Sequence, residues 1–301
     1  MKIIKPSVEF YGAVPTDYEG ALRFIEMAGR TCYKSEDKIT ETSAEAFVRK
    51  LIKAGHLAMV EHSNFVVTRQ GPTLSETATA MIQAGKYLNV IGSEDNELYI
   101  GGSLTAWYNR FLEISNAPAE KIYLSMFEPF RQTFAELFFP NIPFVILPED
   151  VWETCPHNEI PKELHRYSAK FICDRGVSHE LVRHRPCSFA QESTRYVRYD
   201  GNMEFIEPDG FMDWDENAAI CMEEEFKRAE LAYNYLLSNG GLKPQQARAV
   251  LPNALKTEIV VTADVAEWQH LFKLRCAPSA HPDFRRLVIP LRDRFQEEGL
   301  L

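Results

Sequence analysis

Helix and strand signals do not alternate regularly along this chain, and that order limits the folds open to it. Apolar residues recur at helical spacing over residues 17–30, 43–55, 216–237, 244–250 and 282–298. Strand-like runs are fewer and cover residues 64–68, 168–176 and 188–199. Because a doubly wound parallel sheet needs strands and helices in succession, this pattern favours an α+β fold.

Short polar motifs mark where the first two helices should begin. Thr16 and Glu19 have the spacing of a capping box, in which side chains hydrogen-bond free backbone N–H groups, and Thr42 and Glu45 repeat that spacing. Gly55 should end the second helix, since glycine accepts the backbone conformation found at helix ends.

The stretch of residues 71–165 differs from its surroundings. It combines helical patterns near residues 74–84, 103–112 and 119–138 with a glycine-containing loop and a proline-rich run. We interpret it as an inserted helical subdomain, which leaves residues 1–70 and 166–301 as one domain. The aromatic residues of the stretch 71–165 are not interleaved with basic residues, so we expect them to form a hydrophobic core rather than a surface on which nucleic-acid bases stack.

The charge balance argues against two kinds of partner. The formal net charge is −10, so nucleic-acid backbones and anionic membranes would repel the chain at long range. No run approaches the roughly 20 apolar residues of a membrane span. The six cysteines form no CxxC pair and no metal-ligand spacing with histidine, which predicts reduced thiols, no metal site and a cytoplasmic location.

A local excess of positive charge stands out in this acidic chain. Residues 175–198 contain five arginines and His184 but few carboxylates. Guanidinium groups match phosphate oxygens in geometry, so the cluster suggests an anion site, although a solvated basic face is an equally simple interpretation. If residues 188–197 form a strand, Gln191, Ser193 and Arg195 share one face and converge on one ligand.

Spacing within this region favours the anion site. The string RHRPCSFAQESTRY holds Arg183, His184 and Arg185, then seven residues, then Ser193, with Arg195 two positions further on. It resembles the signature of the flavin-dependent thymidylate synthases.

Two further blocks carry the same resemblance, in the same order. GHLAMVEH, which contains His56, resembles the family's N-terminal histidine block. ARAVLPNALKTEIVVTADVAEWQHLFKLRCAPSAH resembles its C-terminal block. The resemblance covers about residues 15–65 and 167–298.

The resemblance implies helices packed on a small, mostly antiparallel sheet, in a homotetramer with its sites at subunit interfaces. It implies that residues 1–70 and 166–301 form a catalytic domain that binds flavin and nucleotide. It also implies a methyltransferase that converts dUMP to dTMP. The carbon would come from 5,10-methylenetetrahydrofolate, and NADPH would supply the reducing equivalents through FAD.

By position, the resemblance assigns to FAD binding His56, Arg183, His184, Arg185, Gln191, Asp264 and His270. It assigns to nucleotide binding Glu180, Gln191, Ser193, Thr194, Arg195, Arg248 and Arg275. Arg275, near the uracil, and Ser193 are the residues it implies for catalysis. Ser193 has no base nearby in the sequence and stands close to an arginine, so we expect it to bind phosphate rather than to act as a nucleophile.

Cys187 lies within the signature and has to be considered as a nucleophile, because classical thymidylate synthases attack uracil with a cysteine. The resemblance implies no catalytic cysteine there, and we expect none. His62 is expected to be structural.

Two positions depart from the pattern that the resemblance implies: Asp264 replaces an expected Asn and Glu180 an expected Gln. A carboxylate beside a flavin disfavours the anionic reduced form, and one beside dUMP repels the phosphate. These departures keep two alternatives open. One is C5 methylation or hydroxymethylation of another pyrimidine nucleotide such as UMP, and the other is a non-catalytic nucleotide- or RNA-binding protein.

Overall fold

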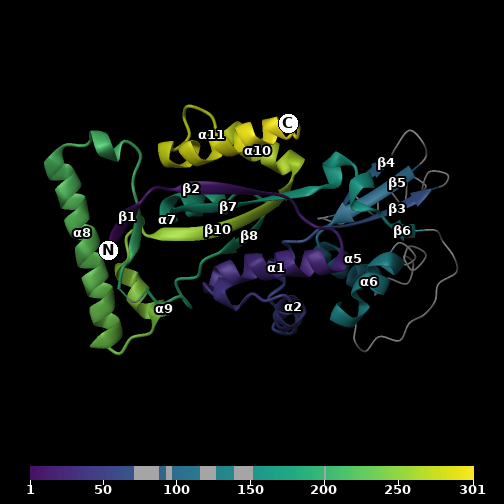
Figure 1. Cartoon of the computed structure of the whole chain (residues 1–301), viewed down its shortest axis with the longest axis horizontal. Coiled ribbons are helices and arrows are strands. Elements are labelled where there is room, and N and C mark those ends of the chain that lie inside the picture. The colour runs from purple at the N-terminus through teal and green to yellow at the C-terminus, as the bar shows by residue number, and fades with distance from the viewer. Residues whose placement is uncertain (71–87, 93–96, 116–126, 139–151, 200) are drawn as a thin grey trace.

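The computed structural model describes residues 1–70, 88–92, 97–115, 127–138, 152–199 and 201–301 (Figure 1). The helix predicted near residues 74–84 lies outside them, as does the first part of the one predicted at 119–138.

A four-stranded antiparallel sheet forms the centre of the molecule. Its order is β2 (Ser7–Ala13), β7 (Arg166–Asp174), β10 (Lys256–Asp264) and β8 (Ser188–Gln191). All nine residues of β7 pair with β10, so two segments far apart in the sequence make the middle of the sheet. The predicted α+β fold with a small antiparallel sheet is confirmed.

Helices cover both faces of this central sheet (Figure 1). On one face, α10 (Val265–Arg275) and α11 (Pro282–Glu297) pack Trp268 and Phe284 against Phe171 and Ile259. On the other face lie α1 (Tyr18–Tyr33) and, beyond it, α2 (Ser43–Lys53), with Ala28 of α1 in one cluster with Val260. The sheet is therefore buried on both sides, as its apolar strands require.

Aspartates, rather than the predicted threonines, cap several helices. The Asp17 side chain accepts a hydrogen bond from the Gly20 backbone N–H at the start of α1, so the capping box expected at Thr16 is displaced by one residue. Thr42 precedes α2 as predicted, but its side chain makes no capping bond. A short aspartate reaches the free N–H groups of a first turn and interacts favourably with the helix dipole.

The segment of residues 71–165 is not wholly helical, which corrects the prediction. It contributes β4 (Leu88–Gly92), β5 (Glu97–Gly102) and β6 (Trp152–Thr154), which form an antiparallel sheet with β3 (Phe65–Gln70) in the order β4-β5-β3-β6. These strands are too short to show a clear alternation in sequence, and pairing with β3 decides their conformation.

Two helices, α5 (Leu104–Ser115) and α6 (Glu128–Phe138), belong to the same segment. Trp107, Phe130 and Phe134 are fully buried against Phe65 of β3. The described aromatic residues of this segment thus form a core, as predicted, and that core continues into α1 and α2.

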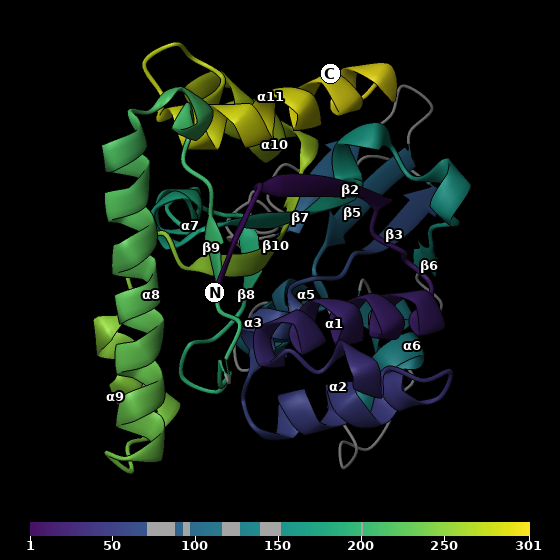
Figure 2. The same ribbon diagram turned by 60° about the vertical axis from the view of Figure 1, so that its left-hand side comes forward.

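A third group of elements stands at the opposite end of the central sheet (Figure 2). The long helix α8 (Glu216–Ser238) and the short α9 (Pro244–Ala247) lie beside the parallel pair β1 (Lys2–Ile4) and β9 (Glu204–Ile206). Phe205 stacks on Phe226 with ring centroids 4.4 Å apart. In the part of the chain that the structure describes, no helix is both long and apolar enough to cross a bilayer.

Glu258, on β10, is the centre of a buried ionic network. Its carboxylate contacts the ammonium groups of Lys34 and Lys170, each at 2.5 Å, and that of Lys256. Burial alone would raise the pKa of Glu258, but hydrogen bonds from the three lysines lower it to about 2. The carboxylate therefore stays ionised where three cations would otherwise repel one another.

Replacing this carboxylate should destabilise the protein strongly. For Glu258→Gln we expect the free energy of unfolding near neutral pH to fall by about 3–5 kcal/mol, because three lysines lose their common partner. Urea denaturation measures the change, and Glu45→Gln, in an exposed pair with Arg49, should cost less than about 1 kcal/mol. Because the pKa of Glu258 in the folded protein lies below the ordinary glutamate value of 4.5, the contribution should disappear as the pH falls from 4.5 towards 2. Equal losses in the two variants would contradict this role.

His62 is a second buried polar group, and it is structural as predicted. Its Nδ1 lies 2.8 Å from the Thr262 hydroxyl, which donates to Ser168. Since that hydroxyl uses its proton on Ser168, Nδ1–H of His62 is the donor of the pair. Burial, together with the charge of Arg166, lowers the pKa of His62 to about 3.

A histidine held neutral in this way makes stability depend on pH. Below its unfolded pKa of 6.5, the unfolded chain takes up a proton at this position that the folded chain does not bind. As the pH is lowered from about 6 to about 5, the free energy of unfolding of the wild-type protein should therefore fall more steeply than that of His62→Asn. The difference in slope should be about 1.4 kcal/mol per pH unit. Urea titrations at each pH test this, with the exposed His179→Asn as the control. Parallel pH profiles for wild type and His62→Asn would disprove it.

Candidate active site

The signature begins where α7 (Arg175–Leu181) ends. Asp174 caps this short helix by accepting from the Val177 N–H at 2.7 Å, and the chain then turns through Arg183, His184 and Arg185. His184 is buried, whereas the two arginines on either side of it are exposed. The turn thus presents two guanidinium groups to solvent and directs the imidazole inward.

His184 and Glu180 both hold Arg275, the last residue of α10. The Glu180 carboxylate lies 2.5 Å from a terminal nitrogen of Arg275, and the Arg275 Nε donates to His184 Nε2 at 3.1 Å. Burial lowers the pKa of His184, which keeps Nε2 free to accept. We call these three residues the Arg275 cluster. Glu180, which departs from the family pattern, is an ion-pair partner here.

The strand expected over residues 188–197 ends early, which corrects the predicted alternation. β8 stops at Gln191, because the Ser193 N–H donates to the Cys32 carbonyl of α1 at 3.0 Å and the next residues form a turn. Gln191 hydrogen-bonds Ser178 of α7 at 2.8 Å. Gln191 therefore does not share a strand face with Ser193 and Arg195.

Ser193, Thr194 and Arg195 instead lie beside the short helix α9, together with Arg248. Arg248 donates to the Thr194 hydroxyl at 3.2 Å, and Arg195 donates to the Gln245 amide oxygen at 3.3 Å. Within the described residues, neither guanidinium has a carboxylate partner. We call Ser193, Thr194, Arg195 and Arg248 the Arg195 cluster, in which two positive charges meet only neutral groups.

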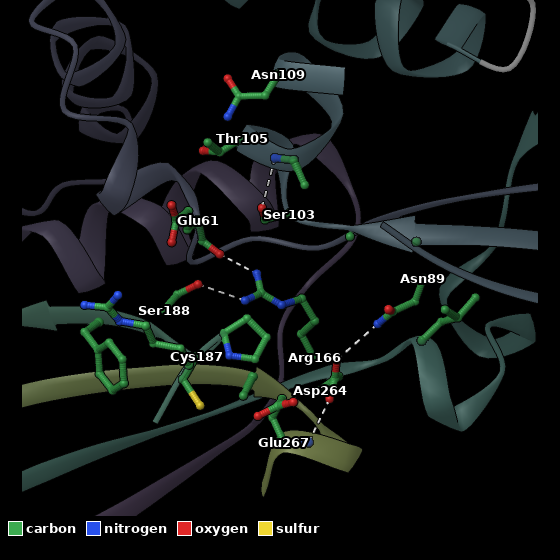
Figure 3. A pocket seen from close by; sticks show the side chains of 18 of the residues that line it. Glu61, Asn89, Ser103, Thr105, Asn109, Arg166, Cys187, Ser188, Asp264 and Glu267 are labelled. Carbon is green, nitrogen blue, oxygen red and sulfur yellow. Dashed lines mark hydrogen bonds between the residues drawn. The ribbon is translucent and has the colours of Figure 1, made fainter. Parts of the chain in front are cut away.

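A cavity of about 710 Å³ opens where the central sheet meets the second sheet (Figure 3). Arg185 of the signature, Asp264 and Glu61 border it. Asp264 caps α10 by accepting from the Glu267 N–H at 2.9 Å, and its other oxygen accepts from Asn89 at 3.1 Å. We call this space the seam cavity.

Arg166, which the sequence did not single out, holds one side of the seam cavity. Its guanidinium donates to the carbonyls of Glu61 and Ser63, to the Ser188 hydroxyl at 2.9 Å and to the Thr262 carbonyl. Ser188 in turn hydrogen-bonds the Glu61 carboxyl. The only sequence signal was an arginine at the start of a buried strand.

Three further residues from the sequence analysis differ in exposure, and one of them, Cys187, lines the seam cavity. His56 and His270 are exposed, and the His56 Nδ1 lies 3.3 Å from the Tyr33 hydroxyl. Cys187 is buried, which raises its pKa to about 12 and disfavours the thiolate that a nucleophile needs. The predicted site residues thus form separate local groups in one chain.

Comparison with known proteins matches this architecture to one family. A family model described as "Thymidylate synthase complementing protein" matches residues 16–79 and 157–298 and passes over the segment between them. A flavin-dependent thymidylate synthase of Geobacter sulfurreducens is 36% identical over 117 residues, which cover 39% of this chain and 50% of that protein.

Two further relatives carry the same description. The flavin-dependent thymidylate synthase of Mycobacterium tuberculosis is 36% identical over 129 residues, covering 38% of this chain and 51% of the relative. That of Mycolicibacterium gilvum is 37% identical over 130 residues, with the same coverage of 38% and 51%. The matched region spans about half the length of these relatives. Because the family model matches more than half of this chain, including all the predicted site residues, the chain belongs to the flavin-dependent thymidylate synthase family.

Proposed function

We propose that this protein is a flavin-dependent thymidylate synthase, which methylates C5 of dUMP to give dTMP. The Arg195 cluster is the observation that carries the proposal. Two guanidinium groups without carboxylate partners, in a chain of net charge −10, suit a doubly charged phosphate. The Ser193 and Thr194 hydroxyls add neutral groups that can donate to the remaining phosphate oxygens.

The Arg275 cluster suits the pyrimidine ring. Glu180 and His184 fix the orientation of the Arg275 guanidinium. The guanidinium carbon lies 5.0 Å from the centroid of the Phe284 ring. A guanidinium held in this way would stabilise negative charge on a uracil carbonyl oxygen, and so favour the enolate form of the ring in which C5 is nucleophilic. In this scheme Glu180 and His184 are positioning residues, and Arg275 is the catalytic one.

The seam cavity supports FAD as the cofactor. Its volume is that of a small-molecule site, and Arg185 at its border belongs to the signature segment implied in FAD binding. When bound, the reduced flavin supplies the hydride that completes the methyl group. The carbon would come from 5,10-methylenetetrahydrofolate, the C5 hydrogen would leave as a proton, and NADPH would restore the reduced flavin.

The separation of the predicted residues supports a site shared between subunits. His56 and Arg183 lie exposed on a single chain, outside the hydrogen bonds of the Arg275 and Arg195 clusters, and the exposed His270 acts on His184 through its charge. A homotetramer with FAD at its interfaces would bring such residues to one ligand. We place the enzyme in the cytoplasm, where its six free cysteines would stay reduced.

The reaction can be followed by the loss of hydrogen from C5. With FAD, NADPH and methylenetetrahydrofolate present, we expect tritium release from C5-labelled dUMP and little from C5-labelled UMP. The purified protein should be yellow or should take up added FAD. Release confined to UMP would transfer the activity to another pyrimidine nucleotide. A protein that binds no FAD and releases no tritium would instead be a non-catalytic nucleotide- or RNA-binding protein.

The two arginine clusters should each contribute to dUMP affinity. Arg195→Ala and Arg275→Ala should each raise the Kd for dUMP roughly ten- to hundredfold in calorimetric titrations, since hydrogen bonds to charged groups contribute about 1.5–3 kcal/mol. Arg228→Ala serves as the control, because Arg228 is exposed on α8 and pairs only with neighbouring glutamates. Unchanged affinity in both cluster variants, with folding intact, would refute the assignment.

A further inference from the structure

The seam cavity has walls from two parts of the chain. One wall, the framework wall, comes from the part of the chain that the family model matches and includes Glu61 and Arg185, and the other comes from β4, β5 and α5. The family model passes over residues 80–156, so the second wall belongs to sequence that the family match does not include. Any ligand contact made by that wall lies outside the sequence that the family model matches.

The framework wall is held rigidly by hydrogen bonds. Arg166 donates to the Ser188 hydroxyl at 2.9 Å, and Ser188 hydrogen-bonds the Glu61 carboxyl. Arg166 also donates to the backbone carbonyls of Glu61 and Ser63. The Glu61 carboxyl is therefore fixed at the border of the cavity, close to Ser103 and Thr105 (Figure 3).

The inserted wall presents polar side chains from the start of α5. Thr105 and Asn109 are one helical turn apart, and Figure 3 shows both on the Glu61 side of the cavity. The Thr105 hydroxyl donates to the Leu57 carbonyl at 3.0 Å, which leaves its oxygen able to accept. Within the described residues, no side chain hydrogen-bonds the Asn109 amide, which offers both a donor and an acceptor.

The charges around the cavity suit the ring of a ligand such as FAD rather than its phosphate groups. Arg166 and Arg185 face Glu61, Asp264 and Glu267, so positive charge is not in excess, in contrast to the Arg195 cluster. Burial raises the pKa of Glu61, so its carboxyl also takes up a proton more readily and can then donate as well as accept. Such a lining suits an uncharged ring whose edge alternates N–H and C=O groups.

We propose that the inserted segment forms one wall of a binding site for a flat nitrogen heterocycle, whose lactam edge hydrogen-bonds Asn109 of that wall and Glu61 of the other. The Asn89 amide, donating to Asp264 at 3.1 Å, ties the two walls together. This proposal rests on the proposed function, under which the ring belongs either to the flavin or to the pterin of the reduced folate. Both rings carry this lactam edge.

Titrations of the whole protein separate the two sources. FAD binding is followed by flavin fluorescence, and tetrahydrofolate binding to the FAD-loaded protein by calorimetry. Asn109→Ala and Glu61→Ala should each weaken one of these ligands about tenfold, the effect of losing one hydrogen bond of about 1.4 kcal/mol. Glu61→Gln should retain most of the affinity, because an amide still donates and accepts. Glu113→Ala, exposed on the same helix, is the matched control and should change neither affinity.

The outcomes are distinct. Weaker FAD binding in Asn109→Ala identifies the flavin as the occupant, and weaker tetrahydrofolate binding alone identifies the pterin. A third outcome is that the wild-type protein binds both ligands and dUMP while Asn109→Ala binds them with unchanged affinity. In that case the inserted wall does not contact the ring, so the inference is wrong, although the proposed function stands. If wild-type protein binds neither FAD nor dUMP, the proposed function itself fails. Circular dichroism and dUMP affinity confirm that each variant is folded.

Discussion

The guanidinium of Arg166 joins segments that are far apart in the sequence. It donates to carbonyls at Glu61, Ser63 and Thr262 and to the hydroxyl of Ser188. An arginine can do this because its five N–H donors lie in one plane, whereas a lysine presents a single point charge. Ser63 extends the connection, since its hydroxyl accepts from the Leu104 N–H at the start of α5. The histidine block, β8, β10 and the inserted segment thus meet around one side chain, and the seam cavity lies beside it.

Ion pairing, and not composition alone, determines where this acidic protein carries uncompensated positive charge. Glu258 neutralises lysines inside the molecule, and Glu180 pairs with Arg275. Only neutral partners contact Arg195 and Arg248 within the described residues. An anion approaching the chain therefore meets uncompensated positive charge at the Arg195 cluster, which counting arginines along the sequence could not distinguish from a solvated basic face.

Local patterns predicted the long elements well and the short ones poorly. The helix predicted at residues 216–237 is α8 almost unchanged, because its apolar spacing and its ends are encoded within the segment itself. β8 stops at Gln191 because the Ser193 N–H, two residues on, donates to the Cys32 carbonyl, a contact about 160 positions away that no local pattern contains. The candidate site residues were predicted from motif spacing and family resemblance, but their division into clusters and the contacts of Arg166 depend on packing between distant segments.

A contact with the inserted segment accounts for the aspartate at position 264, where the family resemblance led us to expect asparagine. At the level of sequence, a carboxylate in place of the expected asparagine is only an unfavourable charge near a flavin. In the folded chain both oxygens accept hydrogen bonds, one from the Glu267 N–H at the start of α10 and one from the Asn89 amide of β4. An asparagine at position 264 has one acceptor oxygen, so it could cap α10 but would turn its own NH₂ towards that of Asn89. Because β4 belongs to the segment that the family model passes over, the carboxylate joins this insertion to the rest of the chain by an acceptor oxygen, and an asparagine could replace that bond only if the Asn89 amide were turned over.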